Sequence, residues 1–228
     1  MFDQLAHGYD FFNLCASFGL DKVWRKNLVL SILKCTERKV LLDVGSGTGD
    51  LIFDLLKYEK IPTDLSLIGM DLSIPMLQKA EAKSWGKQSS SMIQFIQGNS
   101  QFIPVQSEHI DCVMSAFVLR NIKKIIYNTF QEIYRVLKPG GSVFLLDMYV
   151  PSNPGLKLAH KIYLKTVLPA IGYSIFGKRW SGSYLPETIE NFCSPSQITE
   201  YLKNAQFKNI ETKFLSGGMA VLHIARKH

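Results

Sequence analysis

A glycine-rich segment between an apolar run and a helical pattern carries the strongest chemical signal in the chain. Residues 40–50 have the sequence VLLDVGSGTGD, in which three glycines stand at alternate positions. Glycine lets a backbone turn sharply and approach a ligand where any Cβ would clash. The segment therefore predicts a buried strand, then a loop that holds a small ligand through Gly45 and Gly47, then a helix.

The charges beside this loop bear on which ligand it holds. A dinucleotide site prefers the spacing G-x-G-x-x-G, which shapes the turn around a pyrophosphate at a helix N-terminus. Here the third glycine comes one residue early, and Asp43 and Asp50 flank the loop, where they would repel a pyrophosphate. They suit the cationic amino-acid end of S-adenosylmethionine (SAM). We predict a SAM site, and a plain strand–turn–helix connection is the alternative.

Polar side chains follow the next two apolar runs. Asp71 stands about 20 residues beyond the loop, where an acidic side chain can accept hydrogen bonds from both ribose hydroxyls. The alternative for Asp71 is a cap on the helix that begins near residues 73–75. Asn99 and Ser100 offer an amide and a hydroxyl to an adenine ring, with Phe102 as an apolar wall. A simple polar turn is the alternative there.

These side chains need a scaffold that brings strand ends together. Apolar runs occupy residues 40–44, 65–70, 92–96, 112–119, 143–146, 210–215 and 219–225, and helical patterns occupy 51–57, 75–83, 122–137 and 195–204. Continuous apolar strands that alternate with helices indicate a mainly parallel sheet covered on both faces. Ligands of such sheets bind at the carboxyl ends of the strands. We predict one α/β domain over residues 1–228, Rossmann-like, with a mostly parallel seven-stranded sheet and helices on both faces.

Two segments flank this scaffold. Residues 1–38 are predicted to form an N-terminal helical segment. Residues 151–190 carry four of the nine prolines and no strand pattern, so we interpret them as an insertion that covers the substrate.

Within the insertion, Lys157, Lys161 and Lys165 recur at i, i+4 spacing, which predicts a basic amphipathic helix that ends near Pro169. Such a helix favours contact with a membrane surface. A solvated lysine stripe on a helix that faces the core is an equal alternative.

Composition narrows the class of protein. The 228 residues suffice for one α/β core, and a formal net charge of +7 is weak support for an anionic partner. Four scattered cysteines suit a reducing compartment, and no histidine spacing indicates a metal site.

The first residues lack a basic segment followed by an apolar run, so we expect no secretory signal. No stretch approaches the roughly 20 apolar residues of a membrane span. We expect a cytoplasmic protein, and peripheral contact with the membrane is open.

Motifs along nearly the whole chain then point to a family. They are the N-terminal residues Phe2, Asp3, Ala6, Tyr9, Asp10, Asn13, Ser17, Gly19, Trp24 and Arg25, and the segments DVGSGTGD (43–50), FVLRN (117–121), YRVLKPGG (134–141), YLPETI (184–189) and GGMAVLH (217–223). Together they resemble the quinone-biosynthesis C-methyltransferases of the UbiE/MenG type, which are class I SAM-dependent methyltransferases. The N-terminal signature and the Leu-Arg-Asn run are the most specific of these motifs.

The resemblance implies a cofactor, a substrate and contacts. The cofactor is SAM, and by position its contacts fall on Thr48, Asp71, Asn99 and Ser100. The substrate is a prenylated hydroquinone, methylated on a ring carbon in menaquinone synthesis (demethylmenaquinol to menaquinol), ubiquinone synthesis or both. Naphthoquinol and benzoquinol rings, the length of the prenyl tail and a homodimer are all left open.

Methyl transfer to carbon requires a nucleophilic ring. Ionising a hydroquinone hydroxyl, whose pKa is near 10, pushes electron density onto the adjacent carbon. A guanidinium is no free base at neutral pH, so we assign Arg120 to stabilise the phenolate or hold a water, with Asn121 orienting it. Tyr9 is the third candidate. The alternatives are a structural ion pair for Arg120 and a core position for Tyr9.

One departure from the family concerns the residue just before the run 117–121. A serine is expected there, whereas this chain has Ala116, with Ser115 one residue early. Adjacent strand residues face opposite sides, so Ser115 does not replace the missing contact. An inactive SAM-binding subunit is the hypothesis that this departure favours, and a turnover assay discriminates it.

Methylation of RNA, DNA or another small molecule is a further alternative. Amino-methylating enzymes use a D/N-P-P-Y/F motif after the fourth strand, and carbon-5 methylation of a base uses a cysteine in a Pro-Cys context. The chain has neither, and no dense basic patch with interleaved aromatic residues. We therefore expect no nucleic-acid partner.

Overall fold

Seven strands form one sheet in the computed structural model, which describes residues 14–15, 17–34, 39–58, 65–85, 92–177 and 184–228. The strands are β1 (Val40–Val44), β2 (Ser66–Asp71), β3 (Ile93–Gln97), β4 (Ile110–Ala116), β5 (Leu137–Met148), β6 (Lys208–Leu215) and β7 (Ala220–Arg226). Their order is β3-β2-β1-β4-β5-β7-β6, and only β7 runs antiparallel to its neighbours. The predicted α/β fold with a mostly parallel seven-stranded sheet is confirmed.

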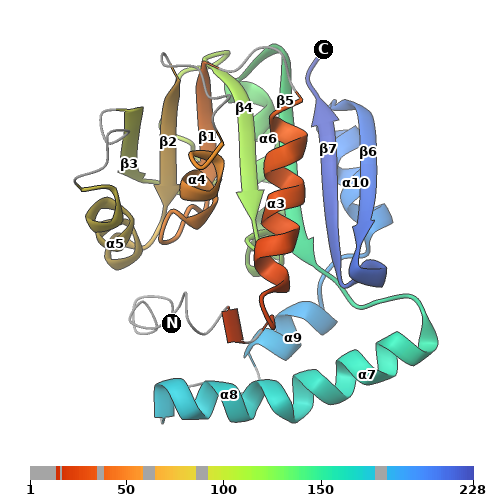
Figure 1. Ribbon diagram of the computed structural model, residues 1–228. Helices are drawn as coiled ribbons and strands as arrows, with labels where there is room; N and C mark the ends of the chain where they lie inside the picture. The colour runs from red at the N-terminus through yellow and green to blue at the C-terminus, as the bar shows by residue number, and fades with distance from the viewer. Residues whose placement is uncertain (1–13, 16, 35–38, 59–64, 86–91, 178–183) are drawn as a thin grey trace.

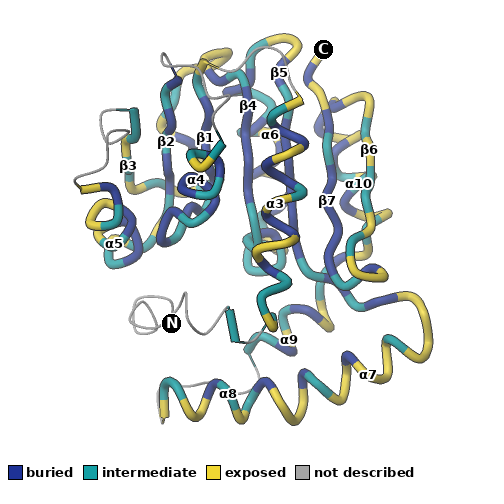
Figure 2. Tube along the Cα trace, in the orientation of Figure 1, coloured by how far each residue is buried: buried dark blue, intermediate teal, exposed yellow. Residues whose placement is uncertain are grey.

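Helices cover both faces of this sheet (Figure 1). They are α3 (Leu20–Ile32), α4 (Asp50–Leu55), α5 (Ile74–Ser84), α6 (Ile126–Val136) and α10 (Pro195–Asn204). Side chains alternate along each strand, so neighbouring residues enter different cores. Leu41 packs with Leu28 and Ile52 from α3 and α4, whereas Leu42 packs with Phe130 from α6. Figure 2 shows the strands and the inner sides of these helices as buried.

The carboxyl edge of the parallel strands carries three further helices. They are α7 (Pro154–Lys165), α8 (Val167–Phe176) and α9 (Tyr184–Glu190). Figure 1 shows α7 and α8 running end to end beyond this edge of the sheet. A 3-10 segment, η2 (Leu119–Ile125), follows β4 and contacts α9. No helix in the described part of the chain is long and apolar enough to cross a membrane.

The insertion differs from the sequence prediction at Pro169. The predicted helix was to end there, but α7 ends at Lys165 and Pro169 is the third residue of α8. The first N–H groups of a helix have no partner within the helix, so proline is tolerated in its first turn. Pro169 therefore marks the start of a second helix, not the end of the first.

Candidate functional site

A cavity of about 360 Å³ opens at the carboxyl edge of the sheet, beside β1. The strand order reverses there, because β2 lies on one side of β1 and β4 on the other. Its lining residues come from α3, the segment 43–51, the ends of β2, β3 and β4, α5, η2 and α9. This is the place where the fold predicts a ligand.

The glycine-rich loop forms one wall of the cavity. The Gly45 N–H donates to Met70 O at 2.7 Å, and the Gly47 N–H donates to Asp71 Oδ2 at 2.8 Å. A Cβ at Gly45, where φ is +74°, would lie 2.4 Å from Val118 Cγ2, so no side chain fits. A Cβ at Gly47, where φ is +53°, would meet no atom within 4 Å. The loop is thus held against the sheet while open space remains beside Gly47 for a ligand.

Unsatisfied polar atoms line the same wall. Asp43 is 1% exposed, and its Oδ2 has no hydrogen-bond partner among the described residues. Burial raises the pKa of Asp43 well above its ordinary value, and the charges of Asp71 and Asp50 raise it further. The Ser46 hydroxyl is also buried without a partner in that part of the chain. Buried polar atoms are normally paired, so acceptors left over at a cavity wall suit a ligand that brings donors and positive charge, as SAM does.

Asp71, the last residue of β2, lies at the end of this wall of the cavity. Its Oδ2 accepts from the Gly47 N–H, and its Oδ1 accepts from the Ser73 N–H at 2.9 Å, at the start of α5. The side chain therefore holds the loop and the first turn of α5 while it lines the cavity. Both sequence interpretations stay compatible with this geometry, and ribose binding stays a prediction.

The remaining predicted cofactor contacts also line the cavity. Thr48 is buried in the loop, and Asn99 and Ser100 follow β3. The Ser100 hydroxyl lies 3.0 Å from the Thr129 hydroxyl, so it is partly engaged within the protein. Their contact with SAM stays a prediction.

The apolar wall of this region is not where we expected it. Phe102 is 76% exposed and is not among the described residues that line the cavity. Leu72 and Met76 line it, the first exposed and the second buried. They follow Asp71 in the chain and so sit beside the expected ribose position.

Arg120 lies next to the cavity but is not among its described lining residues. Its Nη1 donates to Asp147 Oδ1 at 2.6 Å, in a pair whose side chains are 7% and 0% exposed. Its Nε is buried without a partner in the described part of the chain. The geometry shows the ion pair that was the alternative for Arg120, and its role in catalysis stays a prediction.

Asn121 points to the cavity together with a residue that we had not assigned to the site. Its Oδ1 accepts from the Tyr184 hydroxyl at 3.1 Å, and its Nδ2 donates to Phe117 O at 3.3 Å. Burial raises the pKa of Tyr184, and the positive charge of Arg120 lowers it in part. Tyr184 is therefore a neutral hydroxyl at pH 7, able to donate or accept a hydrogen bond.

Apolar side chains surround this polar pair. Val118, Ile122 and Ile125 line the cavity next to Asn121 and Tyr184. Such a wall can hold an aromatic ring while two polar groups orient its oxygen. The site thus has a polar, acidic part at the loop and an apolar part at η2.

Among the lining residues that sequence reasoning did not assign to the site are Arg25 and Tyr184, although both stand in segments that resemble the family. Tyr9 lies outside the described residues. No group of three His, Cys, Asp or Glu side chains in the described ranges could hold a metal ion.

Ser115 and Ala116 face opposite sides, as strand alternation predicts. Ser115 is buried and donates to Val44 O at 2.7 Å, whereas Ala116 lines the cavity. The cavity therefore lacks the hydroxyl that the family resemblance leads one to expect at this position.

Comparison with known proteins agrees with this geometry. The profile of the ubiE/COQ5 methyltransferase family matches residues 1–227. The chain is 36% identical to the demethylmenaquinone methyltransferase of Protochlamydia amoebophila (strain UWE25), over 97% of this chain and 91% of that protein. It is 32% identical to the ubiquinone/menaquinone biosynthesis C-methyltransferase UbiE of Geotalea daltonii, over 100% of this chain and 94% of that protein.

The fold is shared more widely. The crystal structure of a SAM-dependent methyltransferase from Aquifex aeolicus superposes with a TM-score of 0.61 over 88% of both chains, at 17% identity. At that identity the likeness concerns the fold alone. The match over almost its full length shows that the chain belongs to the ubiE/COQ5 methyltransferase family, and that its cofactor is SAM.

Proposed function

We propose that the chain methylates a ring carbon of a prenylated hydroquinone, with demethylmenaquinol as the first candidate and a prenylated benzoquinol as the second. The observation that carries this proposal is the apolar wall of Val118, Ile122 and Ile125 beside the Asn121–Tyr184 pair. That wall suits a flat ring with a hydroxyl group. The names of the Protochlamydia and Geotalea relatives support the same substrates.

The polar pair has a defined task in this proposal. SAM, when bound, supplies a methyl group already activated on a sulfonium. The chain must place the ring carbon in line with that methyl group and favour ionisation of the adjacent hydroxyl. Asn121 and Tyr184 hold the ring oxygen, and Tyr184 contributes a neutral hydroxyl. Tyr9 is a further candidate for this pocket.

Arg120 would act on the same oxygen through its charge. It does not line the cavity, but its charge acts on the Tyr184 hydroxyl, which does. A fixed cation in a buried site stabilises a developing phenolate without reorganisation. We assign Arg120 to this electrostatic role, with Asp147 holding it in place.

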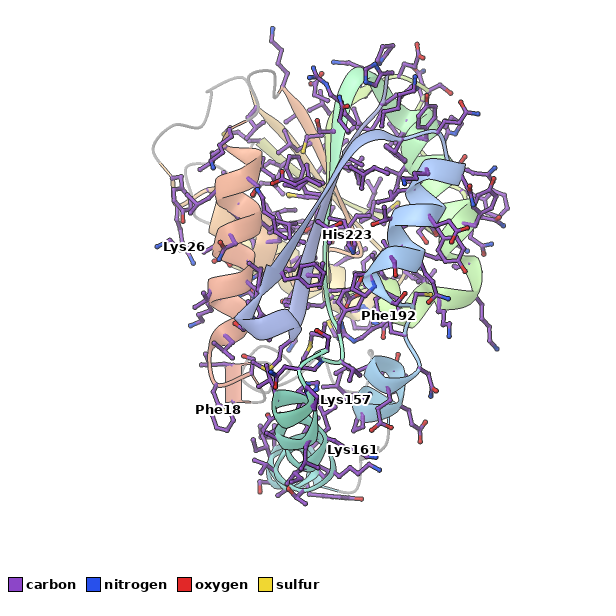
Figure 3. The ribbon with its side chains drawn as sticks, turned by 90° about the vertical axis from the view of Figure 1, so that its right-hand side faces the viewer. Phe18, Lys26, Lys157, Lys161, Phe192 and His223 are labelled. Atoms are coloured by element: carbon purple, nitrogen blue, oxygen red, sulfur yellow. The ribbon has the colours of Figure 1, made fainter. Side chains whose placement is uncertain are left out.

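The insertion would cover the ring and approach the membrane. His160, Leu164 and Leu168 form its buried stripe, while Lys157, Lys161 and Lys165 are exposed. Apolar side chains are also exposed on these two helices: Leu158 (61%) and Ile162 (54%) on α7, and Tyr173 (56%) on α8. Figure 3 shows Lys157 and Lys161 on α7, at the end of the molecule beyond the sheet. A basic, apolar outer face suits an anionic bilayer in which a prenylated quinol resides.

A turnover assay with purified chain tests the function. The substrates are SAM with a short-tailed demethylmenaquinol, a short-tailed demethylated benzoquinol, and bulk transfer RNA. We expect a C-methylated quinol by mass spectrometry and no labelled RNA. SAM binding without turnover of either quinol would favour the inactive subunit, and labelled RNA would contradict the proposed substrate class.

A further inference from the structure

Arg25 is a buried cation in the cavity wall that the mechanism above does not use. It lies on α3, is 6% exposed, and lines the cavity. Its Nη1 donates to Asp21 at 2.8 Å and its Nε donates to Asp54 at 2.7 Å. Its Nη2 lies 3.8 Å from Asp50 Oδ2, beyond hydrogen-bond distance. Nη2 therefore keeps donor hydrogens that these three aspartates do not take up.

The guanidinium stays charged, and its acidic neighbours have other cations. Burial alone would lower the pKa of Arg25, but the hydrogen bond to Asp54 and the charges of Asp54, Asp50 and Asp21 outweigh it, so the pKa is raised. Asp54 also binds Lys57 at 2.6 Å, and Asp50 binds Lys83 at 2.9 Å. The network therefore pairs three carboxylates with three cations. The charge of Arg25 does not have to compensate all three aspartates by itself.

The acidic residues of the cavity can pair with the cationic groups of SAM but not with its carboxylate. SAM has two cationic groups, its sulfonium and its ammonium, and one anionic group, its α-carboxylate. The acidic residues that line the cavity, Asp43, Asp50 and Asp71, suit the cations and repel the carboxylate. Among the described lining residues Arg25 is the only lysine or arginine. A carboxylate that leaves water for this cavity needs a cation, and a guanidinium binds it with directed N–H groups.

We propose that Arg25 binds the α-carboxylate of SAM through Nη2. The inference rests on SAM as the cofactor and does not depend on the quinol. The cofactor site then includes α3 as well as the edge of the sheet, so that α3 and the loop after β1 contact the same ligand. Asp21 and Asp54 are then positioning residues that hold the guanidinium at the cavity wall.

Paired ligands test the assignment without any turnover. Calorimetry compares S-adenosylhomocysteine, the unreactive product form, with its decarboxylated analogue S-adenosyl-3-thiopropylamine. We expect the wild-type chain to bind the analogue at least about tenfold more weakly. Arg25→Gln should weaken S-adenosylhomocysteine by a similar factor and change the affinity for the analogue less than about twofold. Arg25→Lys should keep part of the preference, because the charge remains.

Lys57→Gln is the matched control, since it removes another cation of the same network and leaves both aspartate contacts of Arg25 in place. It should retain the preference for the carboxylated ligand. Equal affinity of the wild-type chain for both ligands would overturn the proposal, and this comparison requires no variant to fold. Equal weakening of both ligands by Arg25→Gln would also overturn it, because Arg25 would then only pack α3 against α4.

Discussion

The Arg120 guanidinium and the Asp147 carboxylate form a buried ion pair that joins η2 to β5, with Nη1 and Oδ1 2.6 Å apart. Asp147 also accepts from the backbone N–H groups of Arg120 and Met148, at 3.1 and 2.7 Å. The carboxylate is therefore satisfied from three donors in the interior. Removing the arginine alone would leave a buried charge with backbone partners only.

The first prediction separates the structural and the electrostatic role of Arg120. Arg120→Met should destabilise the fold by about 3–5 kcal/mol, which corresponds to a Tm lower by roughly 6–20 °C. Arg120→Met combined with Asp147→Asn should recover most of this loss, because the amide oxygen still accepts from the backbone and no charge is buried. The affinity for SAM should be unchanged, while kcat of the double variant should fall about 100-fold.

Thermal melts and single-turnover kinetics check that prediction. A double variant with restored stability and normal kcat would show that the pair serves the fold alone. The Asp147→Asn single variant is the control, since it keeps the cation and removes its counter-charge.

The second prediction concerns Asp71 and the ribose. Because Asp71 also accepts from the Gly47 and Ser73 N–H groups, its substitution changes the loop as well as the ligand contact. Comparing S-adenosylhomocysteine with its 2′,3′-dideoxy analogue isolates the ribose. The wild-type chain should prefer the hydroxylated ligand at least about tenfold, since each hydrogen bond to a charged group contributes roughly 1.5–3 kcal/mol. Asp71→Asn should lose most of that preference; if it weakens both ligands equally, Asp71 serves the loop and α5 only.

The third prediction uses the neighbours Ser115 and Ala116 as a matched pair. Ser115→Ala removes the hydrogen bond to Val44 O, so stability should fall by about 1 kcal/mol and SAM affinity should stay constant. Ala116→Ser places a hydroxyl in the cavity, so SAM should bind about two- to tenfold more tightly, with little change in Tm. Calorimetry and melts of both variants provide the check. Weaker SAM binding by Ala116→Ser would show that the cavity has no room for the family's serine.

Sequence patterns predicted the part of the site that depends on strand ends. Gly47, Asp71 and Asn99 stand at or just after the ends of three different parallel strands, and such ends meet at one edge of the sheet. Local rules of this kind also predicted the opposite orientations of Ser115 and Ala116. The periodicity of apolar residues thus predicted the fold and placed these residues at one edge of the sheet, while their contact with SAM stays a prediction.

Partners that are distant in the chain could not be predicted in the same way. Asn121 meets Tyr184 across 63 residues, and Arg120 meets Asp147 across 27. These contacts depend on how α9 and η2 pack at the sheet edge, which no local spacing encodes. Pro169 shows the same limit in a helix, because proline is found both after a helix and within its first turn.

The fourth prediction is that the free energy of unfolding decreases in acid because His223 becomes protonated. This residue is 1% exposed, its Nε2 lies 3.2 Å from the Tyr149 hydroxyl, and its Nδ1 lies 3.2 Å from the Thr212 hydroxyl. Figure 3 shows it within the body of the molecule. Burial lowers the pKa of His223 from 6.5 to about 4. The neutral ring is therefore favoured in the folded state.

The sign follows from proton linkage. The unfolded chain binds this proton at a higher pH than the folded chain, so the contribution of His223 is complete above pH 6.5 and is lost as the pH falls toward 4. The loss amounts to about 3 kcal/mol. His223→Gln should give a flatter decline of the unfolding free energy over this range, measured with urea at several pH values. Exposed His109→Gln is the control, and an unchanged pH slope in His223→Gln would contradict the assignment.

The last prediction concerns the outer face of α7 and α8. Lys157, Lys161 and Lys165 are exposed beside Leu158 and Ile162. Each basic residue near an anionic surface contributes about 1 kcal/mol, so changing the three lysines to glutamine should weaken binding to phosphatidylglycerol vesicles by roughly 100-fold. Binding should also fall with added salt, because the interaction is screened. Vesicle flotation measures both effects.

A second triple variant has the same change in charge on a different surface. It replaces three exposed lysines of the α3 region with glutamine: Lys22, Lys26 and Lys34. We expect it to float nearly as well as the wild-type chain, since α3 lies against a face of the sheet and not beyond its carboxyl edge with α7 and α8 (Figure 1). The α7 variant should keep its turnover of a short-tailed, water-soluble quinol, because the cavity is untouched. Equal loss of flotation in both triple variants, or no flotation of the wild-type chain, would contradict the proposed membrane contact. Neither result would bear on the proposed reaction in the cavity.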